Sequence, residues 1–187
     1  MDRGELAELL RAHQPADEVE RGHRDAIVAL LGGAEDPFSR ASYTPGHVTA
    51  SAFVLSPDRR SVLLIWHGKL HRWLQPGGHL DAGDGDVVAA ARREVAEETA
   101  VREVAPGPGF PALLDVDVHV IPPNPKRGEP EHRHFDVRVA LVAASDTIQA
   151  GDDALDARWV ALDEVAAMET DASVLRAVAR LRAAVGA

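Results

Sequence analysis

The feature that most constrains the fold of this chain is an acidic segment that follows a glycine pair. Gly77 and Gly78 precede the segment Arg93-Glu94-Val95-Ala96-Glu97-Glu98. On a helix, the three glutamates share one face, because they are separated by steps of three and four residues. Like charges at that spacing repel each other, and a hard cation such as Mg2+ removes this cost by binding carboxylate oxygens. The segment therefore predicts a helix that presents a metal site; the alternative is a solvated helix face.

This arrangement resembles the Nudix box, whose pattern is Gly-x5-Glu-x7-Arg-Glu-U-x-Glu-Glu-x-Gly-U, with U a bulky aliphatic residue. The matching residues are Gly78, Arg93, Glu94, Val95, Glu97, Glu98 and Val101. The flanking strand pattern extends the resemblance to about residues 47–165. The chain also looks like a group of bacterial Nudix proteins that carry Trp-Leu-Gln-Pro-Gly-Gly-His and a later His-x-His-x-Asp-x-Arg stretch.

The chain departs from the box at three places. Asp84 occupies the first acidic position, eight residues rather than seven separate it from Arg93, and Ala100 replaces the second glycine. An extra residue inside the helix would rotate the glutamates off their face, so we expect it in the loop, with Asp86 as the N-cap. A left-handed residue at position 100 would cost roughly 1 kcal/mol with a β-carbon, so we expect the helix to end differently there.

The resemblance implies hydrolysis of a diphosphate linkage in a nucleoside diphosphate derivative or related organic pyrophosphate. It implies that Glu94, Glu97 and Glu98 bind Mg2+, with Mn2+ as an alternative ion, and that the carbonyl of Gly77 contributes to the metal site. Arg93 joins the glutamates as a catalytic residue, since it stands four residues before Glu97 and can hold a carboxylate. An ordinary tight turn is the other interpretation of the glycine pair.

Three other functions are alternatives to diphosphate hydrolysis. A Nudix-fold isomerase of isoprenoid diphosphates uses a catalytic cysteine, and this chain has none. A catalytically silent Nudix module that senses a nucleotide or sugar ligand is the main alternative, and retention of the three glutamates argues against it. A structural partner-binding domain would depend chiefly on the N-terminal extension, whose helices would suit a homodimer interface.

Hydrophobic periodicity predicts an N-terminal helical extension, residues 1–45, and the resemblance implies that residues 46–187 form a Nudix domain. Two helices are expected within residues 3–32, and two more at 86–99 and 171–184. Strands are expected at 47–55, 61–66, 72–75, 113–121, 134–143 and 157–160. Strands interspersed with helices indicate the α/β class, and the resemblance implies an alpha/beta/alpha sandwich with a mixed sheet. The predicted apolar helix stripes include Leu9, Val19, Val88 and Leu175.

Two predicted strands carry polar residues at alternate positions. The first set is Asp115, Asp117 and His119, and the second is His132, His134, Asp136 and Arg138. Alternation places each set on one face, and an antiparallel pair would bring the sets together. We expect the second set to bind substrate, with Arg138 or a histidine contacting phosphate. A solvated sheet face is the alternative, and a zinc site from His132 and His134 is the less favoured one.

Composition narrows the class of partner. The net charge of -10 argues against binding to a nucleic-acid duplex, which needs a positive field. The sequence has no apolar run long enough to span a bilayer, and its first residues lack the apolar stretch of a secretory signal. Zero cysteines suit the cytoplasm. We therefore expect a cytoplasmic enzyme with a small-molecule diphosphate substrate.

Two weaker groups complete the candidates. His67, Lys69 and His71 form a basic cluster. This cluster would bind a phosphate, or it would simply form a solvated turn. The second group is a set of acidic loop residues, one of which would supply an additional metal ligand or the general base. Its members are Glu129, Glu131, Asp152 and Asp153.

Overall fold

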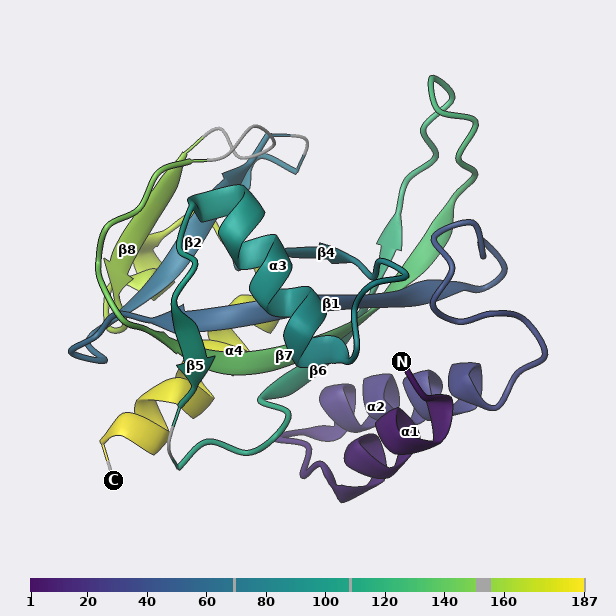
Figure 1. The fold of residues 1–187 in the computed structure, drawn as a ribbon, viewed down its shortest axis with the longest axis horizontal. Coiled ribbons are helices and arrows are strands. Elements are labelled where there is room, and N and C mark those ends of the chain that lie inside the picture. Colours follow the sequence, from purple (N-terminus) through teal and green to yellow (C-terminus); the bar gives the residue numbers. More distant parts are fainter. Residues whose placement is uncertain (69, 108, 151–155, 187) are drawn as a thin grey trace.

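The computed structural model describes residues 1–68, 70–107, 109–150 and 156–186. Two long strands form the centre of a mixed sheet, and in Figure 1 they run across the middle of the molecule. Strand β1 (Gly46–Leu55) runs parallel to β7 (His132–Ala143), with paired residues from Gly46 and Arg133 to Leu55 and Val142. The position of β1 inside the sheet buries it along its whole length, including the polar residues His47, Thr49 and Ser51 of its first half.

Shorter strands extend the sheet on both sides of this pair. Strands β2 (Ser61–His67) and β4 (Gly77–His79) are antiparallel to β1, while β5 (Val104–Pro106) and β6 (Asp115–Ile121) are antiparallel to β7. Strands β3 (Arg72–Leu74) and β8 (Ala157–Ala161) pair with β2. The α/β sandwich with a mixed sheet is therefore confirmed.

Helices cover both faces of the sheet. Figure 1 shows α3 (Val87–Thr99) in front of β1 and α4 (Ala172–Val185) behind the sheet. The even-numbered residues of β1, such as Ala50, join the apolar cluster on the α3 side, whereas Phe53 joins the cluster on the α4 side. A short 3-10 helix, η1 (Val165–Ala167), precedes α4. No helix within the described ranges is long and apolar enough to cross a membrane.

The N-terminal residues form two helices, as predicted. Helix α1 (Arg3–Ala12) and helix α2 (Glu18–Leu31) pack on each other, and α2 packs on β6. Buried leucines of both helices belong to the same apolar cluster as α3. The division of the chain after residue 45 stays a prediction.

An ionic cluster links these helices to the C-terminal helix. Glu20 of α2 has no exposed surface, and its Oε1 lies 2.6 Å from His13 Nε2. Arg180 of α4 donates to the same oxygen at 3.0 Å, and it also donates to the carbonyls of Gln14 and Leu114. The charge of Glu20 is thus neutralised inside the protein by groups from both ends of the chain.

Four individual residues of the predicted apolar helix stripes are not fully buried. Leu9, Val19 and Leu175 are 39%, 59% and 37% exposed, and Val88 is only partly buried. Alanines such as Ala90 and Ala177 are buried on these helices instead. A small side chain gives a weak hydrophobic signal, so periodicity favoured the larger Val88 and Leu175 over these two alanines.

Candidate active site

Helix α3 carries the three glutamates and is capped as predicted at its start. The Oδ1 of Asp86 accepts a hydrogen bond from the N–H of Ala89 at 2.7 Å. The extra residue therefore lies in the loop, and the helix runs without interruption through Glu98. The expectation for the other end was wrong, because Ala100 adopts the left-handed conformation with φ 58°. Its N–H donates to the carbonyl of Ala96, and this closing bond offsets the steric cost of the β-carbon.

Arg93 fixes the acidic groups of the site. Its guanidinium donates to Glu94 Oε1 at 2.8 Å and to Glu97 Oε2 at 3.1 Å. On its other side it donates to Asp84 Oδ2 at 3.0 Å and to the carbonyl of His79 at 2.8 Å. Asp84 thus steadies the arginine despite being shorter than the usual glutamate. One planar cation joins α3, its preceding loop and β4, as the fork of donors on arginine allows.

The two glycines of β4 allow the strand to lie against both β1 and the glutamates. A β-carbon on Gly77 would lie 2.2 Å from Ser51 Cβ, and one on Gly78 would lie 2.7 Å from Oε1 of Glu94. The N–H of Gly77 donates to Glu98 Oε2 at 2.9 Å. These residues form a short strand paired with β1 rather than an ordinary tight turn. Two of the three glutamates therefore meet the glycine pair.

The surroundings of Glu94 and Asp84 shift the pKa values of these two carboxyl groups in opposite directions. Burial raises the pKa of Glu94, and the charges of Glu97 and Asp81 act in the same direction, despite the opposing effect of Arg93. The hydrogen bond to Asp84 raises the pKa of Arg93, which stays protonated. Burial acts to raise the pKa of Asp84, but hydrogen bonds from Arg93 and the N–H of Asp81 outweigh it and lower that pKa.

This donor set fits a hard divalent cation. All its ligands are oxygens, and Glu94 is partly buried with a charge that Arg93 alone does not compensate. Each carboxylate has two oxygens, so the contact with Arg93 leaves a second oxygen able to bind a cation. Among the described residues, the one group of three ligand atoms within 4.8 Å of one another is instead a set of histidines.

A protein-family model matches most of the sequence and shows the family of the chain. The model of the NUDIX domain matches residues 45–181. The chain belongs to the Nudix family. This membership identifies it as a Nudix-type diphosphatase. No curated protein matches the sequence.

Solved Nudix structures have the same fold. A C. elegans Ap4A hydrolase has a TM-score of 0.54 at 17% identity, over 74% of this chain and 97% of that one. The NUDIX domain of Shewanella oneidensis NrtR, complexed with ADP ribose, has a TM-score of 0.52 at 22% identity, over 83% and 96%. The E. coli dihydroneopterin triphosphate pyrophosphohydrolase has a TM-score of 0.51 at 17% identity, over 75% and 96%. At these identities the likeness concerns the fold.

The strand pair predicted to bind substrate in this Nudix protein is antiparallel. Its register places Asp115 opposite Arg138 and His119 opposite His134. The two polar sets therefore share one face of the sheet, as the alternation predicts.

Most of this face is buried inside the protein. Arg138 is 2% exposed, and it donates to Asp136 Oδ2 at 2.8 Å and to Asp115 Oδ1 at 3.1 Å. Arg176 of α4 donates to Asp115 Oδ2 at 2.7 Å, and Ser51 donates to Asp136 Oδ2 at 2.8 Å. Arg138 and Asp136 are thus neutralised within the fold, and their contact with substrate stays a prediction.

His132 and His134 lie where β7 begins, and the structure brings other histidines to them. The rings of His47, His79 and His119 surround His134, with centroids 4.9, 5.1 and 5.6 Å away. His47 was not among the predicted site residues. A signal for it exists in the sequence, because polar residues recur at alternate positions at the start of β1, an otherwise apolar strand. The substrate-binding role of His132 and His134 stays a prediction.

The remaining candidates include acidic loop residues and residues outside the described ranges. Lys69, Asp152 and Asp153 lie outside them. Glu129 and Glu131 lie in the loop between β6 and β7, where Glu129 pairs with Asn124. That loop projects beyond the sheet in Figure 1.

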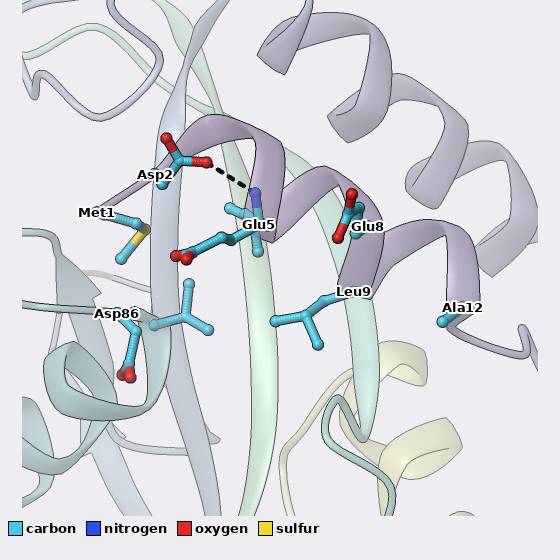
Figure 2. Close-up of a pocket in the computed structure, with 9 residues that line it drawn as sticks. Met1, Asp2, Glu5, Glu8, Leu9, Ala12 and Asp86 are labelled. Atoms are coloured by element: carbon cyan, nitrogen blue, oxygen red, sulfur yellow. Dashed lines mark hydrogen bonds between the residues drawn. The ribbon is translucent and has the colours of Figure 1, made fainter.

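A groove lies elsewhere on the protein, between α1 and the start of α3 (Figure 2). Its volume is about 510 Å³, and it is lined by carboxylates as well as by apolar side chains. The carboxylates belong to Asp2, Glu5, Glu8 and Asp86. Its described lining residues include no lysine, arginine or histidine that would bind a phosphate, whereas Arg93 lies among the carboxylates of the α3–β4 site.

Proposed function

We propose that this Nudix protein hydrolyses a diphosphate linkage in a nucleoside diphosphate derivative or related organic pyrophosphate, in the presence of Mg2+ or Mn2+. Glu94, Glu97 and Glu98 hold the cation in this proposal, and the carbonyl of Gly77 completes the protein ligands. The observation that carries it is the contact of the acidic face of α3 with β4, where the N–H of Gly77 donates to Glu98 and Gly78 leaves room for Glu94.

The protein residues hold the carboxylates ready for the cation. Arg93 fixes one oxygen each of Glu94 and Glu97, and the Gly77 amide fixes one oxygen of Glu98. Such preorganisation lowers the cost of gathering three like charges before substrate binds. A bound divalent cation supplies charge neutralisation at the phosphates and lowers the pKa of an attacking water.

The proposed substrate class is supported by the compounds named for proteins with the same fold. The names of those proteins include Ap4A, ADP ribose and dihydroneopterin triphosphate, each of which contains a phosphoanhydride. We propose these three compounds as the first substrate panel. A cytoplasmic location and a homodimer stay predictions from the sequence.

The test is release of phosphate or nucleotide from this panel with and without Mg2+. Glu98→Gln keeps the size of the side chain and one acceptor oxygen but removes its charge. We expect kcat to fall on the order of 100-fold or more, with unchanged thermal unfolding. Glu103→Gln, the same change at an exposed glutamate, is the matched control and should retain activity.

Two results would contradict the proposal. Normal Mg2+-dependent turnover by Glu98→Gln would remove Glu98 from the metal site. Binding of the panel by calorimetry, with no hydrolysis of any compound, would favour a ligand-sensing module.

A further inference from the structure

A cluster of histidines lies on the opposite side of β4 from the glutamates. Its members come from four strands and are His47, His79, His119, His132 and His134. His47 and His132 stack with ring centroids 5.1 Å apart, and His134 lies 4.9 Å from His47 and 5.2 Å from His132. The sheet itself produces the cluster, since β1 and β7 pair His47 with His134 and β6 and β7 pair His119 with His134.

Three of these histidines have the spacing of metal ligands. Ring nitrogens of His47, His132 and His134 all lie within 4.8 Å of one another. Tetrahedral zinc with nitrogen ligands at about 2.0 Å requires nitrogens roughly 3.3 Å apart. Side-chain rotations that move each ring nitrogen by about an ångström would bring the nitrogens to this separation. All three residues belong to strands of the central pair, so the backbone holds the set together.

Hydrogen bonds fix the tautomers of two of these rings. His47 Nδ1 lies 3.1 Å from the carbonyl of Ser42, and His132 Nδ1 lies 2.8 Å from the carbonyl of Pro130. A carbonyl only accepts, so both Nδ1 atoms carry the proton and both Nε2 atoms expose a lone pair. Donation from the second ring nitrogen to a carbonyl is the usual support of a metal-binding histidine.

The free nitrogens are buried without a partner. Within the described part of the chain, Nε2 of His47 and Nε2 of His134 are buried and have no hydrogen-bond partner. His47 is 1% exposed, so water does not readily satisfy this nitrogen. Buried polar atoms are rarely left unpaired, and a ligand that accepts nitrogen lone pairs would satisfy both.

We propose that His47, His132 and His134 form a binding site for one divalent transition-metal ion of the zinc type, separate from the carboxylate site. Imidazole nitrogens suit Zn2+, Ni2+ and Cu2+, whereas Mg2+ takes oxygen ligands. Three protein ligands leave a fourth position, and the ring of His79 lies 5.0 Å from that of His47.

The two sites are close but do not share ligands. The backbone carbonyl of His79 accepts from Arg93 on the glutamate side of β4, while its ring lies with the histidines. The inference therefore does not rest on the proposed hydrolysis. A metal in the histidine site would join the start of β1 to the start of β7, one strand away from Gly77.

The experiment is calorimetric titration of the full chain with Zn2+ in excess Mg2+, which occupies oxygen sites. We expect one Zn2+ per chain and a rise in the melting temperature. Removing a ligand with His132→Gln should weaken binding by more than about tenfold. The matched control His71→Gln removes an exposed histidine and should bind Zn2+ like the natural chain. Glu98→Gln should also bind Zn2+ normally, because it alters only the carboxylate site.

Equal Zn2+ affinity in His132→Gln and the natural chain would overturn the proposal, as would the lack of a one-to-one site in the natural chain. Loss of affinity in Glu98→Gln but not in His132→Gln would assign the ion to the carboxylates. If His132→Gln fails to fold, X-ray absorption of the natural chain loaded with one Zn2+ decides the matter. Three imidazole nitrogens support the site, and an all-oxygen shell refutes it.

Discussion

Replacing Gly77 by alanine should damage both stability and activity, because β4 has no room for a side chain at this position. The new β-carbon would lie 2.2 Å from Ser51 Cβ, 2.6 Å from Ser51 Cα and 2.8 Å from the carbonyl oxygen of Ala50. Carbon atoms in contact prefer about 3.5 Å or more, so the two strands must separate by about 1.3 Å. Two of the three clashing atoms belong to the backbone and cannot rotate away.

The displacement has a cost in stability and a larger cost in catalysis. Overpacking of this size destabilises proteins by about 1–3 kcal/mol, which lowers the melting temperature of a chain this long by roughly 2–12 °C. The N–H of Gly77 lies 2.9 Å from Glu98, and a shift of about 1 Å breaks that bond. Misplacement of a catalytic group by about 1 Å can cost on the order of 100-fold in rate.

The assays are thermal unfolding and steady-state hydrolysis in Mg2+, measured on the same preparations. Gly22→Ala is the control, since no atom lies within 4 Å of its new β-carbon and position 22 lies inside α2. It should raise stability by about 0.5–1 kcal/mol and leave kcat unchanged. A Gly77→Ala protein with the stability and kcat of the natural chain would refute the close packing of β4 on β1.

Three further predictions concern the same structure. In Gly78→Ala, the atoms nearest to the new β-carbon belong to the carboxylate of Glu94, which can move aside. Activity should therefore fall about tenfold or more, while the free energy of unfolding in urea changes little; a marked loss of stability would contradict this. Arg93→Lys should lower kcat by about 10–100-fold, because a single ammonium cannot hold four acceptors; activity equal to the natural chain would argue against this role. Glu20→Ala should cost about 3–5 kcal/mol in urea unfolding, since it leaves Arg180 partly buried without its carboxylate. Burial acts to raise the pKa of Glu20, but its hydrogen bonds and ion pair outweigh this and lower it. The contribution of Glu20 is therefore complete above the unfolded-state pKa and is lost as the pH falls through the folded-state pKa; a cost of Glu20→Ala that does not shrink on acidification would contradict this.

Much of α3 could be predicted because its determinants are local. The steps between Glu94, Glu97 and Glu98 place them on one face of any helix, and Asp86 caps the helix through its own side chain. The end at Ala100 was mispredicted because the conformational preference of one residue was weighed without the hydrogen bond that closes the helix. The strand pair of the polar face was also predictable, since alternation and a connecting loop determine which residues lie together.

The family, the acidic helix face and the alternation of polar residues along the later strands can all be recognised from the order of the amino acids. Only the tertiary structure decided that β4 lies on β1, that Arg138 is buried among carboxylates, and that His47 joins His132 and His134. The physical reason is the range of the interactions. Helical and strand periods relate residues a few positions apart, whereas the register between β1 and β7 relates residues 87 positions apart, such as Thr49 and Asp136. That register depends on how all the apolar faces pack at once, so no local pattern contains it.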